Sequence, residues 1–207
     1  MQAERVNARY LPGLPLPYGA TVDDHGAQFS IFSRHATRVT LVLFSSSEPN
    51  DPGEEIPLDP IHNRTGDIWH IWVEGIREGQ LYGYRIDGPY LPAQGLRFNR
   101  NKLLVDPYAR AVTGNFQWKL SDARGYDHDS PEGTDSFSTI DSAPGAPRNI
   151  VLKSDAGLFF PPLCIPFENT VIYELHLKGF TCHPSAKVNH PGTFLGLTEK
   201  IPYLQQL

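Results

Sequence analysis

The chain has little of several features that would assign it to a class at once. It contains only two cysteines, Cys164 and Cys182, too few for the disulfide framework of a small secreted domain, so we expect two reduced thiols. No apolar run approaches the ~18 residues that a membrane span requires, which argues against a transmembrane protein. The charged N-terminus is not followed by an apolar stretch, so we expect no signal peptide and a cytoplasmic location.

Positive charge is also scarce. Lysine and arginine number 18 against 23 aspartates and glutamates, which gives a net charge of −5. A chain without a basic surface is not expected to bind nucleic acid or an anionic membrane. The eight histidines do not have the spacing of metal ligands, and the sequence has neither a glycine-rich phosphate loop nor a nucleophile elbow. We therefore expect no metal site and no cofactor.

Long amphipathic helices are missing between residues 19 and 114, whereas glycine and proline are plentiful, at 18 and 19 of the 207 residues. Both residue types favour turns. Four short runs with the composition of β-strands lie between clusters of glycine, proline, asparagine and aspartate: residues 27–33, 39–44, 68–73 and 81–86. We predict a mainly β protein with an immunoglobulin-like, antiparallel β-sandwich over residues 19–115.

The segments on either side of this sandwich have a different character. Residues 1–18 are rich in proline, which favours an extended lead-in because proline lacks the backbone N–H of a ladder or helix. Residues 119–149 are loop-like and unusually long for a loop within one domain, and residues 158–166 form a second proline-rich bridge. We interpret residues 116–167 as an interdomain connector that lies over a neighbouring surface, with Trp118 at the seam.

Residues 168–207 show the order strand, loop and helix that is typical of an α/β unit. The strand is expected at residues 171–177. A helix is expected to begin with Thr198 as its N-cap and with Pro202 in its first turn.

Several segments, taken in order, resemble one family. They are residues 17–21, 29–33, 66–70, 82–90, 97–99, 102–110, 141–144 and 171–181. This ordered set resembles the N-terminal family 48 carbohydrate-binding module and the start of the catalytic domain in bacterial glycogen debranching enzymes of the isoamylase type, which belong to glycoside hydrolase family 13. No single tripeptide among them is specific. The resemblance implies that residues 168–207 are the first β/α unit of a truncated (β/α)₈ barrel, and that the parent enzyme hydrolyses α-1,6-glucosidic branch points of glycogen or limit dextrin with retention.

A retaining glycosidase needs two carboxyl groups ~5–5.5 Å apart. The resemblance implies that these groups lie on later barrel strands, and a full barrel takes ~250 residues. We therefore expect no catalytic residue in this chain and no hydrolysis by this chain alone. Asp127, Asp129 and Glu132 are interpreted as solvated charges of the connector.

Four side chains are candidates for carbohydrate binding: Trp69, Trp72, Tyr84 and His176. Trp69 and Trp72 are an odd number of residues apart, so they lie on opposite faces of their strand, with one inside the sandwich. The other has a flat face on which the C–H face of a glucose ring can stack. Packing against the barrel is the alternative role for that tryptophan. Tyr84 carries the same ambiguity, and His176 either lines the sugar pocket of the parent enzyme or packs within the barrel.

The expected partners are an α-glucan, such as glycogen or maltodextrin, and the barrel domain. Two other functions remain open at this point. One is a stand-alone glucan-binding or scaffold protein without catalysis. The other is the N-terminal part of a glycogen branching or trehalose-releasing relative, because the sandwich module is shared by all of these enzymes.

Overall fold

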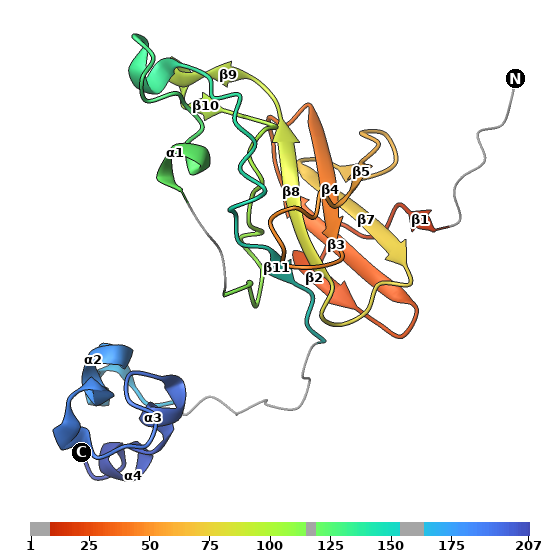
Figure 1. Ribbon diagram of the computed structural model, residues 1–207. Coiled ribbons are helices and arrows are strands. Elements are labelled where there is room, and N and C mark those ends of the chain that lie inside the picture. Colours follow the sequence, from red (N-terminus) through yellow and green to blue (C-terminus); the bar gives the residue numbers. More distant parts are fainter. Residues whose placement is uncertain (1–8, 115–118, 154–163) are drawn as a thin grey trace, which may run out of the picture. The chain divides into compact units, whose positions relative to one another are not determined.

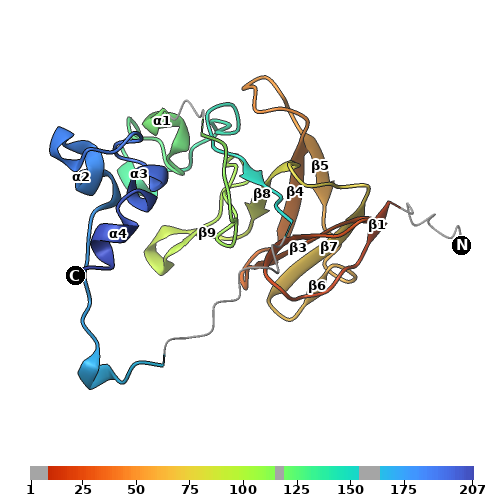
Figure 2. The same cartoon turned by 90° about the horizontal axis from the view of Figure 1, so that it is seen from below.

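The computed structural model describes residues 9–114, 119–153 and 164–207. The chain divides into two units, residues 1–157 and residues 158–207. The first unit is a β-sandwich of two antiparallel sheets packed face to face (Figures 1 and 2). The prediction of a mainly β, antiparallel chain is therefore confirmed. Trp118, which was expected at the interdomain seam, lies outside the described residues.

The first sheet has the strand order β1-β7-β3-β2, and β6 pairs with β7. Its strands are β1 (Tyr10–Leu11), β2 (Gly19–Val22), β3 (Gly26–Phe32), β6 (Arg64–Thr65) and β7 (Ile68–Glu74). The second sheet has the order β11-β8-β4-β5. Its strands are β4 (Arg38–Phe44), β5 (Glu54–Pro57), β8 (Leu81–Asp87) and β11 (Asn149–Ile150). The longest strands, β3, β4, β7 and β8, correspond to the four runs recognised in the sequence.

The core lies between the two sheets and follows the period-two alternation of the strands. Phe29 of β3 and Trp69 of β7 point inward from the first sheet, and Leu41 of β4 and Tyr82 of β8 point inward from the second. The rings of Phe29 and Tyr82 meet edge to face, with their centroids 5.1 Å apart. Because the side chains between these positions point outward, each sheet also has an outer face that needs its own cover.

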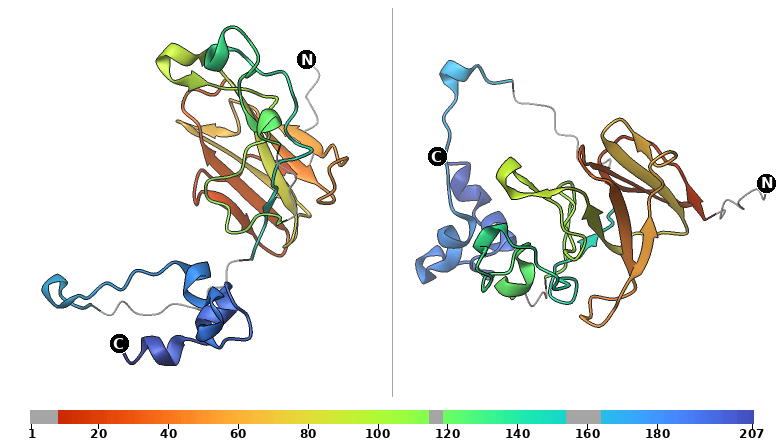
Figure 3. Two further views of the ribbon diagram at one scale, coloured as in Figure 1. Left: turned by 60° about the vertical axis from the view of Figure 1, so that its left-hand side comes forward. Right: turned by 90° about the horizontal axis from the view of Figure 1, so that it is seen from above.

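A short hairpin follows β8. It consists of β9 (Tyr90–Leu91), the 3₁₀ helix η1 (Pro92–Gln94) and β10 (Leu96–Arg97). The described part of the expected connector contains helix α1 (Leu120–Ala123) and the 3₁₀ helix η2 (Gly133–Asp135). Figure 3 shows the hairpin and η2 close together at one end of the sandwich.

The described part of the second unit, residues 164–207, contains three short α-helices and two 3₁₀ helices. They are η3 (Phe167–Asn169), α2 (Leu177–Cys182), η4 (Pro184–Ala186), α3 (Phe194–Thr198) and α4 (Ile201–Leu204). Pro202 lies in the first turn of α4, as predicted. The predicted N-cap was wrong, because Thr198 ends α3 and Thr193 caps that helix through its side-chain oxygen. Among the described residues, no helix has the length and apolar character needed to cross a bilayer.

The strand expected at residues 171–177 is not present. Residues 171–176 have no regular secondary structure, and Leu177 begins α2. A strand is held by backbone hydrogen bonds to a neighbour, and no strand pairing among the described residues involves this segment. Val171 and Ile172 are accordingly 94% and 80% exposed. The described residues of the second unit therefore do not form the β/α unit of a barrel that the sequence predicts.

Candidate functional site

The two tryptophans of β7 lie on opposite faces of the strand, as their spacing predicts. Trp69 is completely buried in the core, where its Nε1–H donates to the carbonyl of Ser33 at 3.1 Å. Trp72 points to the outer face of the first sheet and is half-buried. Of these two tryptophans, Trp72 is therefore the one that presents its indole to a ligand.

Two of the four sugar-binding candidates are corrected by this placement. Trp69 cannot contact a ligand because its ring is enclosed by the core. Tyr84 of β8 is 1% exposed, and its ring lies edge to face with that of Tyr82, with 6.0 Å between centroids. Both side chains stabilise the sandwich, because inward-facing positions of two stacked sheets exclude solvent.

His176 belongs to the second unit. Its imidazole Nδ1 accepts a hydrogen bond from the backbone N–H of Gly179 at 3.0 Å and so caps helix α2. The side chain is exposed. A role in sugar binding stays a prediction for this residue.

A row of four cross-strand neighbours forms the floor around Trp72. In the strand register Leu11 of β1 pairs with Trp72, Trp72 pairs with Gln28 of β3, and Gln28 pairs with Thr21 of β2. Directly opposed residues of antiparallel strands share one face of the sheet. The four side chains therefore form a row across four strands on the outer face of the first sheet.

Gly26 provides the space for the indole. A Cβ at Gly26 would lie 2.7 Å from Cζ2 of Trp72 and 2.3 Å from the carbonyl oxygen of Val73, so no larger residue fits without displacement. Gly26 lies on the same face of β3 as Gln28, which places the six-membered ring of Trp72 against the sheet surface. The ring is held against the sheet at this point instead of projecting freely into solvent.

The proline-rich lead-in passes over the same face, and three polar side chains hold it there. Gln28 donates from Nε2 to the carbonyls of Leu14 (2.6 Å) and Leu16 (3.2 Å), and its Oε1 accepts from the N–H of Leu14 (2.8 Å). Two further hydrogen bonds join the sheet to the lead-in: Ser30 Oγ donates to Pro15 O at 2.6 Å, and His70 Nδ1 lies 2.7 Å from Pro12 O. Burial of these polar side chains is possible because the lead-in backbone satisfies their hydrogen bonds.

Together the lead-in and the sheet enclose a groove of about 480 Å³, here called the Trp72 groove. Its wall consists of lead-in residues, and its far side carries Thr21 and Asp23. Oδ1 of Asp23 accepts from the N–H groups of His25 (2.7 Å) and Gly26 (2.9 Å). Hydrogen bonds from the backbones of His25 and Gly26 lower the pKa of Asp23, so the carboxylate is charged at neutral pH. The lining residues are Leu11, Gly13, Leu14, Leu16, Pro17, Thr21, Val22, Asp23, Gln28 and Trp72.

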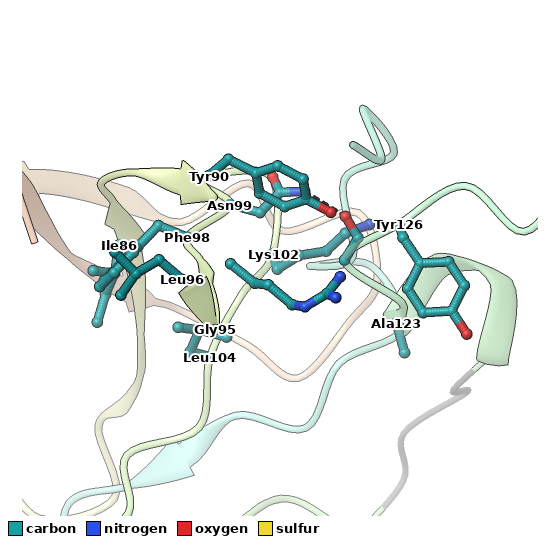
Figure 4. A pocket seen from close by; sticks show the side chains of 12 residues that line it. Ile86, Tyr90, Gly95, Leu96, Phe98, Asn99, Lys102, Leu104, Ala123 and Tyr126 are labelled. Carbon is teal, nitrogen blue, oxygen red and sulfur yellow. Dashed lines mark hydrogen bonds between the residues drawn. The ribbon is translucent and has the colours of Figure 1, made fainter. Parts of the chain in front are cut away.

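A larger pocket of about 630 Å³ lies beside the β9–β10 hairpin (Figure 4). Ile86, Leu96, Phe98 and Leu104 give it apolar walls. Arg97 is also among its lining residues. The polar groups of this pocket are mostly engaged in holding the connector.

Lys102, which lines the same pocket, shows this most clearly. Its ammonium donates to Ser138 Oγ (3.0 Å) and to the carbonyls of Asp122 (2.8 Å) and Ile140 (2.7 Å), which uses all three of its donors. Burial lowers the pKa of Lys102. The pocket therefore offers apolar contact and few free hydrogen-bonding groups.

Sequence reasoning missed most of the Trp72 groove. It identified Trp72 by residue type, but the groove also requires Gly26, Gln28 and the leucines of the lead-in. The local signal was weak, because a glutamine and a serine at alternate positions of β3 indicate only an outward face. The lead-in that covers this face lies 12 to 15 residues earlier in the chain. This cover is a tertiary contact, which the local sequence of β3 does not indicate.

The segment 17–109 matches the protein family described as carbohydrate-binding module 48, the isoamylase N-terminal domain. Over 203 residues the chain is 38% identical to isoamylase 1, chloroplastic, of Oryza sativa subsp. japonica, and the match covers 96% of this chain and 23% of the relative. Over 201 residues it is 42% identical to a glycogen debranching enzyme of Yersinia enterocolitica, with 94% of this chain and 28% of the relative covered. The chain thus spans about a quarter of the length of these curated relatives.

Solved structures share the fold. A pullulanase from Bacillus acidopullulyticus superposes with a TM-score of 0.56 at 18% identity, over 88% of this chain and 18% of the pullulanase. The catalytic module of the glycogen-degrading pneumococcal virulence factor SpuA superposes with a TM-score of 0.57 at 22% identity, over 94% of this chain and 26% of that one. At such identities the similarity concerns the fold alone.

Proposed function

We propose that this chain is the N-terminal region of a glycogen debranching enzyme. Its residues 17–109 match the family 48 carbohydrate-binding module, the N-terminal domain of isoamylases. The whole protein would hydrolyse α-1,6-glucosidic branch points of glycogen or limit dextrin in the cytoplasm. The region described here would hold the α-glucan. A branching or trehalose-releasing activity has less support, because the relatives named above are a debranching enzyme and an isoamylase.

The Trp72 groove carries this proposal. An indole held against the sheet by Gly26 offers an apolar face to the C–H face of a glucose ring. Thr21 and the charged Asp23 lie in the same groove, and their side-chain oxygens can hydrogen-bond the sugar hydroxyls. An aromatic surface flanked by a few polar groups is the general composition of small-ligand sites.

Catalysis would belong to the rest of the protein. The acidic residues of the connector are engaged locally, as Asp127 shows by accepting the N–H of Asp129 at 3.1 Å, while Glu132 is exposed. Neither residue is held in an enclosed pair of carboxyl groups such as a retaining glycosidase needs. Incubating this chain with glycogen should release no reducing ends, and their release would contradict the assignment of catalysis elsewhere.

A second role has its own support. Five large apolar side chains in the segments that follow β8 are exposed, namely Leu91, Leu104, Val105, Tyr108 and Val112, and Leu104 also lines the 630 Å³ pocket. Large exposed apolar surface on a globular domain marks an interaction site. We propose that this surface packs against the catalytic barrel of the whole protein, which would make the module a structural support as well as a glucan-binding domain.

Affinity electrophoresis in gels containing glycogen tests glucan binding. Trp72→Ala should abolish most of the retardation of the chain, because it removes the stacking surface. Phe32→Ala is the matched control, since Phe32 is a 49%-exposed aromatic residue of the same sheet that does not line the groove. Equal retardation of the wild type and Trp72→Ala would reject the groove as the binding site and leave packing as the supported role of the module.

A further inference from the structure

The wall of the Trp72 groove comes from outside the matched module. The family match begins at residue 17, whereas Leu11, Gly13, Leu14 and Leu16 precede it. These residues make up a large share of the groove lining. Without them Trp72 would lie on an open sheet surface and not in a groove.

The lead-in is fixed to the sheet by specific contacts. The backbone at Gly13 approaches β7 so closely that a Cβ there would lie 2.9 Å from the backbone N of Trp72. Gln28, which lies beside Trp72 in the cross-strand row, makes three hydrogen bonds to Leu14 and Leu16 and has no polar group left over. The side chains of Leu14 and Leu16 are nevertheless 64% and 56% exposed, so they are available to a ligand.

We propose that residues 11–16 are a structural part of the glucan site and that Gln28 is the positioning residue that sets this wall at the right distance from Trp72. This inference rests on the proposed glucan binding at the Trp72 groove. In this arrangement a glucose ring that stacks on Trp72 also packs its edge against Leu14 and Leu16. Binding at this site is then a property of the module together with its lead-in, because the matched module supplies six of the ten residues that line the groove and the lead-in supplies the other four.

Calorimetric titration of the full chain with maltoheptaose tests the proposal directly. Leu14→Ser and Leu16→Ser should each weaken binding about fivefold by removing apolar contact, which is measurable as a change in dissociation constant. Ile61→Ser is the matched control, because Ile61 is 79% exposed and does not line the groove. Unchanged affinity in both leucine variants, with loss of binding in Trp72→Ala, would overturn the role of the lead-in.

Gln28→Glu tests the positioning role. Glutamate has the same length and still accepts from the N–H of Leu14, but it cannot donate to the carbonyls of Leu14 and Leu16. The variant should bind maltoheptaose more weakly while showing the wild-type shift of tryptophan fluorescence at saturating sugar. A residue that only stabilises the fold would lower the unfolding temperature and leave the dissociation constant of the folded protein unchanged.

The outcomes separate the two proposals. If wild-type protein does not bind maltoheptaose, or if Trp72→Ala binds as well as wild type, glucan binding at the groove is wrong. If wild type binds and Trp72→Ala does not, but Gln28→Glu binds with wild-type affinity, the groove is a glucan site and the positioning role of Gln28 is wrong. Ser30 also holds the lead-in, by its hydrogen bond to Pro15, but it does not line the groove. Ser30→Ala should therefore weaken binding less than Gln28→Glu.

Discussion

The outer faces of the two sheets are covered in different ways. On the first sheet, polar side chains hold a strip of main chain, and an aromatic ring is left partly open beside it. On the second sheet, Val42 and Phe44 are covered by apolar side chains of later segments, Leu103 and Ala143. A cover held by hydrogen bonds to main chain leaves the side chains of the strip free for a ligand, whereas an apolar cover uses its side chains for stability.

The second face also contains a buried guanidinium. Arg148 is 2% exposed, its Cζ lies 4.0 Å from the centroid of the Phe44 ring, and its donors reach the carbonyls of Ser46, Glu48 and Asp51. One side chain thus ties the loop between β4 and β5 to the segment just before β11. The comparison predicts that changes on the second face lower stability, while changes on the first face lower glucan binding.

The largest expected effect is that of Arg148→Met. The substitution keeps much of the apolar contact with Phe44 but removes a buried charge that donates to the carbonyls of Ser46, Glu48 and Asp51, which should lower the free energy of unfolding by about 3 kcal/mol. Urea denaturation measures this. Arg124→Met is the control. Arg124 also lies over an aromatic ring, with its Cζ 5.6 Å from the centroid of the Tyr126 ring, but it is only partly buried. A loss below about 1 kcal/mol for Arg148→Met would show that the loop is held by other contacts.

A smaller loss is expected for Leu103→Ala. Leu103 is 6% exposed and fills the space above Gly83, where a Cβ would lie 2.8 Å from its Cδ1. The cavity should cost about 2 kcal/mol in the free energy of unfolding. The same measurement on Leu14→Ala, on the first face, should show a change within about 0.5 kcal/mol, since Leu14 is 64% exposed. Equal losses in both variants would remove the distinction between the two faces.

The strands of both sheets were largely predictable, and the covers were not. The runs at 27–33, 39–44, 68–73 and 81–86 are short, rich in apolar and aromatic residues, and bounded by turn-forming residues, which are local properties of a strand. The contacts of Arg148 join residues about 100 positions apart, from Ser46 to Asp51, and no local pattern encodes them. The expected strand at 171–177 failed for the same reason, because a strand depends on a partner that its own sequence does not specify.

The candidate site was predictable to a similar extent. The odd spacing of Trp69 and Trp72 requires that one faces the core and the other faces solvent. Each tryptophan follows an isoleucine in the sequence, so the local pattern does not decide which of the two faces the core. The strand pairing decides it, since Trp72 shares a face with Gln28 and Leu11. Tyr84 was retained as a candidate because an aromatic strand residue has the same local signature whether it faces a ligand or the core.

A pH-dependent effect on the second sheet is expected from Asp106. Its carboxylate accepts from Tyr82 OH (2.9 Å) and the N–H of Tyr108 (2.8 Å) and is 2% exposed. Burial raises the pKa of Asp106 above its usual value. Because the folded state then holds the proton to higher pH than the unfolded state, this group contributes a loss of stability as pH rises from about 4 through the raised pKa.

Asp106→Asn should remove this pH dependence. Urea denaturation at a series of pH values gives the free energy of unfolding of wild type and variant, and the wild-type value minus the variant value should fall as pH rises. Asp51→Asn is the matched control with the opposite sign. Partial burial acts to raise the pKa of Asp51, but hydrogen bonds from Gly53, Ser46 and Ser45 outweigh it and lower that pKa to about 2. Its difference should therefore rise with pH between about 2 and 4 and then stay constant. A flat difference for Asp106→Asn would show that the pKa of this carboxyl is the same in the folded and unfolded states, which would contradict the raised value.

The smallest expected effect belongs to the first face. Ser30→Ala removes one hydrogen bond to the carbonyl of Pro15, which should change the global free energy of unfolding by less than about 1 kcal/mol. The effect should instead be local, because the lead-in can detach without opening the core. Hydrogen exchange of the Leu14 N–H, which donates to Gln28, measures this local opening and should become faster in the variant. If exchange at Leu14 keeps the wild-type rate while global stability falls, the lead-in is part of the cooperative core, and the contrast between the two faces does not hold.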